Sequence, residues 1–170
     1  TAQSHLWLAS RLREELPPEM AQAVLETALL RRKAAAKFSR AGQMYFTREA
    51  LEQASAEPVA RHRARRYAAA GAAHIADLGC GIGGDALALA AGSRVTGIDR
   101  ELLRLAMARE NVAAYGHAER FQTLQADLES LSPLAVDLPG TPFGSVAPFG
   151  LDDDGTPVLC ISELAEHTRN

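Results

Sequence analysis

The residues with the clearest chemistry lie in one short glycine-rich segment. Residues 75–85 read Ile-Ala-Asp-Leu-Gly-Cys-Gly-Ile-Gly-Gly-Asp, with glycine at 79, 81, 83 and 84. Glycine lets the backbone approach a ligand closely and adopt turns that other residues resist. An apolar run precedes the glycines and a helix-forming run follows them, so the segment predicts a strand, a turn and a helix N-terminus. This arrangement suits the polar end of a nucleotide-like ligand.

Acidic residues near the glycines narrow the choice of ligand. Gly79, Gly81 and Gly84 satisfy the dinucleotide pattern G-x-G-x-x-G, and Asp99 follows Gly79 by twenty residues. However, Asp85 stands where a pyrophosphate would bind and would repel it. A carboxylate there suits S-adenosylmethionine, which carries a sulfonium and an ammonium and no phosphate. We therefore expect S-adenosylmethionine rather than NAD.

Each acidic residue has an expected role toward that cofactor. Asp77 would hold the amino-acid end, Asp99 both ribose hydroxyls by charge-assisted hydrogen bonds, and Asp127 the adenine amino group. A purely structural interpretation stays open for each one. Asp77 would then stabilise the turn, Asp99 would cap the following helix, and Asp127 would be an ordinary loop acid.

The elements that position these residues are predicted to alternate between strand and helix. Strands are expected at 75–78, 94–98 and 121–124, with helices at 84–91 and 101–115. Such alternation predicts a parallel α/β sheet with right-handed crossovers. Upstream helices are expected at 2–16, 19–38, 48–54 and 59–70, with Thr47 as an N-cap. Leu6, Leu8, Leu12 and Leu16 roughly share one face of the first helix, as do Met20, Val24, Ala28 and Leu29 of the second.

The last forty residues have a different texture, rich in proline and glycine. Residues 145–151 and 157–161 predict a β-hairpin around an acidic turn, and Ser162 would cap a final helix over 163–167. The fold expected is therefore α/β: an N-terminal helical cap (1–72), a partial doubly wound parallel Rossmann-like core (73–131) and a hairpin tail of different origin (132–170). The hairpin would cover the edge of a truncated sheet or pair with a second copy of the chain.

Composition limits the classes of function. The 170 residues carry a net charge of −3, but residues 31–66 hold ten Lys or Arg against three Glu. This local excess points to a polyanionic partner or to solvated helix faces. Two cysteines, Cys80 and Cys160, fit a reduced intracellular protein, and Cys80 is expected to be a small turn residue. No apolar run reaches the roughly 18 residues of a membrane span, so cytoplasmic localisation is expected.

The motif Asp-Leu-Gly-Cys-Gly-Ile-Gly-Gly-Asp, followed by Val-Thr-Gly-Ile-Asp and Gln-Ala-Asp, resembles the first three motifs of class I S-adenosylmethionine-dependent methyltransferases. Residues 31–38 and 44–49 resemble a bacterial branch with a THUMP-like domain and suspected RNA-modifying members. The likeness covers about residues 10–130. It implies that Tyr45, Phe46 and Thr47 help close the cofactor pocket and that the basic helices lie near RNA. The predicted cofactor-binding residues are Tyr45, Phe46, Thr47, Asp77, Gly79, Gly81, Gly83, Asp85, Asp99, Arg100 and Asp127.

The catalytic part of such an enzyme is harder to find. Its motif follows strand four as an Asp-Pro-rich segment, and here Leu134–Pro139 is the candidate, with Asp137 as a weak catalytic choice. Residues from about 137 to 170 resemble instead the start of a split β-barrel related to pyridoxamine-phosphate oxidase, which handles flavin or haem. Too few residues match to close a barrel, so FMN is not expected, and the histidines have no metal-ligand spacing.

Three hypotheses follow from these patterns. The first is a methyltransferase-like protein that binds S-adenosylmethionine and acts on RNA if it is catalytically complete. The second is an inactive chimeric or truncated scaffold joined near residues 131–138. The third is a fragment of an NAD- or flavin-binding oxidoreductase.

Overall fold

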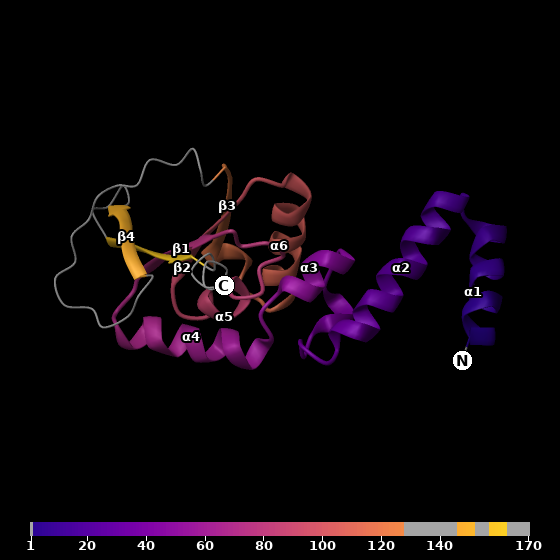
Figure 1. The fold of residues 1–170 in the computed structure, drawn as a ribbon, viewed down its shortest axis with the longest axis horizontal. Coiled ribbons are helices and arrows are strands. Elements are labelled where there is room, and N and C mark those ends of the chain that lie inside the picture. The colour runs from indigo at the N-terminus through magenta and orange to yellow at the C-terminus, as the bar shows by residue number, and fades with distance from the viewer. Residues whose placement is uncertain (1, 128–145, 152–156, 163–170) are drawn as a thin grey trace, which may run out of the picture.

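The computed structural model describes residues 2–127, 146–151 and 157–162. It contains helices and a five-stranded sheet, drawn in Figure 1. Among the described residues, no helix combines the length and apolar character needed to cross a membrane. The predicted final helix over 163–167 and the candidate Asp137 lie outside the described residues.

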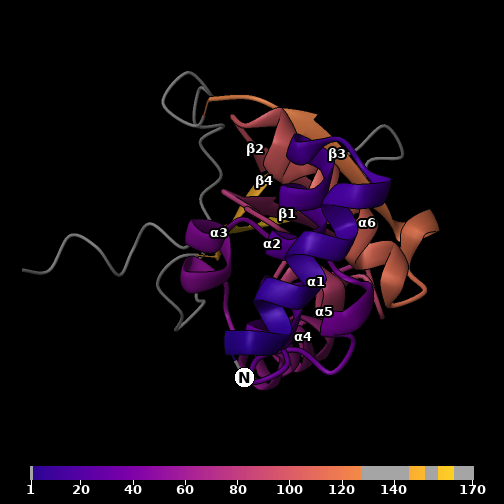
Figure 2. The same cartoon turned by 90° about the vertical axis from the view of Figure 1, so that its right-hand side faces the viewer.

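Two helices form an N-terminal hairpin, α1 (Ala2–Glu15) and α2 (Pro18–Ala34). The break between them falls at the predicted proline pair: Pro17 precedes α2 and Pro18 is its first residue, because proline ends a preceding helix and fits the first turn of the next. The hairpin lies at the end of the molecule away from the sheet (Figures 1 and 2). The apolar side chains expected to share one face of α2 are exposed, namely Met20, Val24 and Leu29.

The segment between α2 and the sheet, residues 38–72, is the cap segment, and it packs closely on the core. It contains the 3-10 helix η1 (Ala41–Gln43), α3 (Arg48–Gln53) and α4 (Glu57–Ala69). The predicted N-cap is confirmed, because Thr47 Oγ1 accepts a hydrogen bond from Ala50 N at 3.1 Å. Gly71 ends α4 with a φ of 74°.

The predicted parallel sheet is confirmed. Its strands are β1 (His74–Leu78), β2 (Arg94–Asp99) and β3 (Phe121–Gln125), connected by α5 (Ala86–Leu89) and α6 (Leu102–Ala114), with η2 (Ala118–Arg120) before β3. Ala76 pairs with Thr96, and Thr96 pairs with Gln122. Successive right-handed crossovers to neighbouring strands place α5 and α6 on the same face of the sheet. The helices that would cover the other face of a doubly wound fold are not among the described residues.

The first crossover helix is shorter than the sequence predicts. The expected helix began at residue 84, whereas α5 begins at Ala86 and residues 81–85 form turns. Gly83 has a φ of 79°, which lies outside the helical region, so the turn extends further along the chain. This longer turn faces the candidate site.

The predicted hairpin is confirmed and extends the sheet. β4 (Val146–Leu151) pairs antiparallel with β5 (Pro157–Ser162), and β5 pairs in parallel with β1. The strand order is β3-β2-β1-β5-β4, so the hairpin covers the edge that β1 would otherwise expose. Pairing of the hairpin with a second chain stays a prediction.

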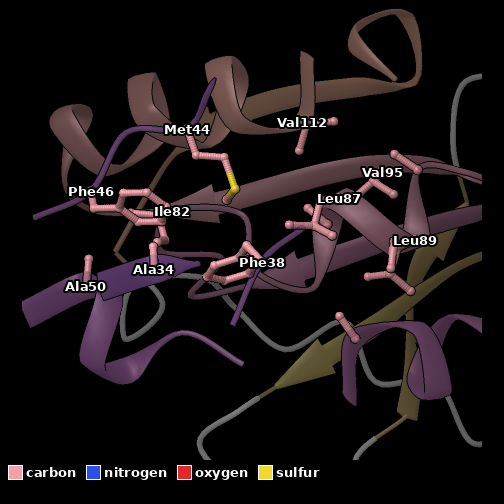
Figure 3. Packing of buried hydrophobic residues seen from close by; sticks show 14 of the residues in the cluster. Ala34, Phe38, Met44, Phe46, Ala50, Ile82, Leu87, Leu89, Val95 and Val112 are labelled. Atoms are coloured by element: carbon pink, nitrogen blue, oxygen red, sulfur yellow. The ribbon is translucent and has the colours of Figure 1, made fainter. Parts of the chain in front are cut away.

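The core lies between the cap segment, α5, α6 and the sheet. Figure 3 shows Phe38, Met44 and Phe46 of the cap segment beside Ile82 and Leu87. The rings of Phe38 and Phe46 are tilted, with centroids 5.9 Å apart. Residues 38–72 therefore share one hydrophobic core with the glycine turn and the sheet.

Candidate functional site

The glycine turn is held rigidly at the carboxyl end of β1. Gly79, Gly81 and Gly83 have φ values of 72°, 53° and 79°, which favour glycine. The N–H groups of Gly79 and Cys80 both donate to Ile98 O, at 2.8 and 3.0 Å. Because Ile98 belongs to β2, the turn is anchored between the ends of two parallel strands, where ligands of open α/β sheets bind.

Asp99 ends β2 and joins the turn to the next helix. Its Oδ2 accepts from Gly81 N at 3.1 Å, and its Oδ1 accepts from Glu101 N at 2.9 Å. The second contact supports the structural interpretation of Asp99 as a residue that starts α6. Both roles are compatible, since each carboxylate oxygen can accept a further hydrogen bond from a ligand. The side chain is 6% exposed.

A cavity opens over the glycine turn, below α3. Four of the residues predicted to bind the cofactor line it, namely Asp77, Gly79, Gly81 and Asp85. The remaining lining residues come from the turn, the cap segment and α6: Cys80, Gly84, Ala50, Gln53, Ala54, Ser55 and Arg104. A Cβ atom on Gly84 would lie 3.4 Å from Ala54 Cβ and from Ser55 N. Glycine at 84 therefore lets the cap segment approach the turn closely.

The sequence analysis missed two arginines here: Arg104, which lines the cavity, and Arg63, which contacts two of its lining residues. Arg63 of α4 lies 2.5 Å from Asp85 Oδ2 and donates to Ser55 Oγ at 2.9 Å. Arg104 of α6 contacts Glu49 and Gln53 of α3, each at 3.5 Å. Arg63 had been counted only as part of a basic region, and its position gave no sign of a buried acidic partner. The cavity consequently presents both signs of charge.

Asn111 is the most important connection that the sequence analysis missed. This fully buried side chain accepts from Tyr45 N at 2.7 Å and donates to Tyr45 O and Ile82 O at 3.0 and 2.9 Å. It therefore joins the cap segment to the glycine turn from α6. The sequence did hold a signal for the burial of Asn111, though not for its partners. Asn111 lies three residues after Ala108 and therefore on the same face of an amphipathic helix.

Three predicted residues lie before α3 and outside the cavity lining. Phe46 is buried in the core, and Thr47 caps α3. Tyr45 is 43% exposed, and the Arg31 guanidinium lies 4.9 Å from its ring centroid. They position α3, whose residues line the cavity, but a direct cofactor contact stays a prediction for each of them.

Arg100 and Asp127 follow β2 and β3 at the carboxyl edge of the sheet, and both are exposed. Because parallel strands end at one edge, this places them on the side of the sheet that carries the turn and Asp99. Neither lines the cavity described above. Their contact with the cofactor also stays a prediction.

The parallel sheet, its connecting helices and the glycine turn define a Rossmann-like α/β fold of the methyltransferase type, and comparison with known proteins agrees. Residues 75–141 match the family described as Methyltransferase domain. These findings support class I S-adenosylmethionine-dependent methyltransferases as the class to which this region belongs. Residues 1–34 match a domain of unknown function, DUF8688.

Particular relatives carry the same assignment. The chain is 46% identical over 124 residues to an uncharacterized S-adenosylmethionine-dependent methyltransferase of Mycobacterium tuberculosis, in strains CDC 1551 / Oshkosh and H37Rv. The match covers 67% of this chain and 32% of each relative, so it spans about a third of their length. A structure from Porphyromonas gingivalis W83, provisionally named a methyltransferase, has a TM-score of 0.53 at 21% identity. It covers 72% of this chain and 34% of that one, and shows the fold alone.

The comparisons do not support the other resemblances. The methyltransferase match ends at residue 141 and therefore crosses residues 131–138, where a chimeric junction was expected. Neither a THUMP-like domain nor a split barrel is supported. The relatives' cofactor, as their name states, is S-adenosylmethionine, and they support this cofactor over NAD or flavin.

Proposed function

We propose that the chain contains the cofactor-binding part of an S-adenosylmethionine-dependent methyltransferase. The observation that carries this proposal is the cavity at the carboxyl end of β1, where buried Asp77 and Asp85 meet a glycine turn held by Asp99. Buried carboxylates beside exposed backbone suit a cationic ligand without phosphate. A diphosphate would face two negative charges in a partly desolvated site.

The residues of this chain fit the cofactor in one further respect. Asp85 Oδ1 is buried and makes no hydrogen bond within the part of the chain that the structure describes. A buried oxygen of this kind favours a ligand that brings a donor. When bound, S-adenosylmethionine supplies a methyl group on an electrophilic sulfonium.

The chain's contribution is to bind and orient. Asp77 and Asp85 would hold the amino-acid end, Asp99 the ribose hydroxyls and Asp127 the adenine amino group, and α3 would shield the turn from water. Positioning of this kind accelerates methyl transfer without covalent catalysis.

Calorimetric titration of the intact chain with S-adenosylhomocysteine, NADH and FMN tests this proposal. We expect binding of S-adenosylhomocysteine in the micromolar range, about −8 kcal/mol, and no binding of the other two. Asp99→Ala should abolish binding, and Glu119→Gln, an exposed residue of η2, is the control for loss of one negative charge. Tighter binding of NADH than of S-adenosylhomocysteine would indicate an oxidoreductase instead. If the folded protein bound none of the three ligands, it would be an inactive scaffold.

We further propose RNA as the substrate, on the basis of the exposed face of α4. Arg61, His62, Arg65 and Arg66 are exposed there, on a helix that contacts α5, and Arg61 also pairs with Glu57 of the same helix. Much of the remaining basic excess serves the fold, since Lys33 pairs with Glu52 and Lys37 donates to three backbone carbonyls. The proposal therefore rests on α4 rather than on the whole of residues 31–66.

Fluorescence anisotropy with a structured RNA tests the substrate proposal. Affinity should fall steeply between 50 and 200 mM salt, by roughly one power of the salt concentration per phosphate contact. Arg65→Gln should weaken binding and flatten this salt dependence, whereas Arg13→Gln in α1 should not. Equal effects of the two substitutions would show that α4 does not contact the RNA.

A further inference from the structure

Asp85 is a buried carboxylate whose two oxygens have different environments. Oδ2 lies 2.5 Å from the Arg63 guanidinium, while Oδ1 is buried with no hydrogen-bond partner among the described residues. The Asp85 side chain is 3% exposed and lines the cavity over the glycine turn. One oxygen is thus held by the protein, and the other is available to a ligand.

The surroundings of Asp85 favour one kind of hydrogen-bond donor for its Oδ1 atom. Arg63 is held in turn by Ser55 Oγ at 2.9 Å, so the orientation of the carboxylate is fixed by two elements, α4 and the chain after α3. A buried carboxylate gains most from a charged donor, because charge-assisted hydrogen bonds are stronger than neutral ones. Of the groups on the proposed cofactor, the α-ammonium is a charged N–H donor, whereas the sulfonium carries no N–H or O–H.

We propose that Asp85 Oδ1 accepts the α-ammonium of the cofactor, and that Arg63 is the positioning residue that aims Asp85 at it. This inference rests on the proposed function and assigns the amino-acid end chiefly to Asp85, where the sequence had suggested Asp77. Arg63 acts through Asp85 and fixes the orientation of its carboxylate before the ligand arrives.

Calorimetry with two ligands tests the assignment on the intact chain. The ligands are S-adenosylhomocysteine and an analogue in which hydrogen replaces the α-ammonium. Asp85→Asn should lower affinity for S-adenosylhomocysteine by about tenfold or more, as expected when a charge pair is broken. The same substitution should leave affinity for the analogue unchanged, and Glu119→Gln should change neither.

The role of Arg63 is tested by a double-mutant cycle. Arg63→Met should weaken binding of S-adenosylhomocysteine, but the pair Arg63→Met and Asp85→Asn should bind no more weakly than Asp85→Asn alone. A merely structural arginine would instead give additive losses for both ligands. Thermal unfolding of each variant confirms that folded protein is compared, and Asp85→Ser replaces Asp85→Asn if the latter does not fold.

The outcomes separate the two proposals. If wild-type protein does not bind S-adenosylhomocysteine, the proposed function fails and the assignment fails with it. If wild-type protein binds and Asp85→Asn binds equally well, the assignment is overturned while the proposed function stands. Equal weakening of both ligands by Asp85→Asn would likewise overturn it, because the effect would not depend on the ammonium.

Discussion

Two helical regions precede the sheet, and they are joined to the rest of the molecule in different ways. The cap segment, residues 38–72, contributes Phe38, Met44 and Phe46 to the core and is tied to α6 through buried Asn111. The N-terminal hairpin of α1 and α2 leaves Trp7 and Met20 exposed at 69% and 54%. The match of residues 1–34 to a separate family follows the same division. The cap segment is therefore part of the site, whereas α1 and the first half of α2 adjoin it; the end of α2 contributes Leu30 and Ala34 to the shared core.

The polar contacts of the cap segment also differ from those of the N-terminal hairpin. Glu57 accepts from Ser39 N at 2.7 Å and from the Tyr115 hydroxyl at 2.8 Å, and it pairs with Arg61. These contacts join the start of α4 to the end of α6. Among the described residues, the ion pairs of α1 join only exposed side chains on the same helix, such as Arg11 and Glu14. Exposed pairs of this kind contribute little to stability.

The largest effect is expected at the connection between the cap segment and the glycine turn. Asn111→Leu should lower the free energy of unfolding by about 3 to 5 kcal/mol, because three backbone groups lose their partner in a buried position. Urea denaturation measures this loss, and calorimetry should show weaker binding of S-adenosylhomocysteine. Val112→Ala, next to it in the core, should destabilise the protein without that loss of affinity. A cost below about 1 kcal/mol for Asn111→Leu would mean that the cap segment is not tied to the turn.

The next effect concerns the turn on which the cap segment rests. Gly83→Ala should cost about 1 to 3 kcal/mol, since Gly83 has a φ of 79° and a Cβ would lie 3.3 Å from Ala108 Cα. Gly92→Ala, where a Cβ meets open space, is the matched control. Thermal unfolding compares the two. Similar melting temperatures would contradict a rigid turn.

A smaller effect, dependent on pH, is expected at Glu57. Burial raises the pKa of Glu57, but hydrogen bonds from Ser39 and Tyr115 and the charge of Arg61 outweigh it and hold the pKa below its ordinary value. Ionised Glu57 therefore stabilises the fold above the ordinary glutamate pKa, and this contribution is lost as the pH falls through the lowered value. Glu57→Gln should cost about 2 kcal/mol at pH 7.

Urea denaturation at pH 7 and at a pH below the ordinary glutamate pKa measures this dependence. The difference in stability between wild type and Glu57→Gln should shrink as the pH falls. A difference that stays constant would show that ionisation of Glu57 does not hold the cap segment to α6.

The smallest effect is expected in the N-terminal hairpin. Met20→Gln and Leu29→Gln should each change the free energy of unfolding by less than about 0.5 kcal/mol, because both side chains are already exposed. A loss of more than about 1 kcal/mol in the free energy of unfolding, measured by urea denaturation, would show that the apolar face of α2 is covered in solution. The N-terminal hairpin and the cap segment would then not differ as described.

The local elements were predictable because their signals are local. The three parallel strands, the hairpin at 146–162 and the N-cap at Thr47 all follow from alternation, turn residues and capping chemistry within a few positions. The glycine turn was predictable for the same reason, and the structure brings Asp77 and Asp85 together at the cavity beside it. The helix after the turn was predicted to begin two residues too early because glycine at 83 and 84 extends the turn.

Contacts between distant parts of the chain could not be predicted. Arg63 meets Asp85 across 22 positions, and Asn111 meets Tyr45 across 66. Nothing in the spacing of a single sequence encodes such pairs, because they depend on how the cap segment docks. The exposure of α2 was missed for a related reason, since an apolar face shows that a helix can be covered but not whether it is.

The most direct test of the central claim follows backbone amide signals of the isotope-labelled chain by nuclear magnetic resonance as S-adenosylhomocysteine is added. We predict shifts at Gly79, Gly81 and Gly84 and at Ala50 to Ser55, with signals of α1 and the first half of α2 unchanged. Shifts confined to the N-terminal hairpin, or no shifts in folded protein at millimolar ligand, would contradict a cofactor site built from the glycine turn and the cap segment.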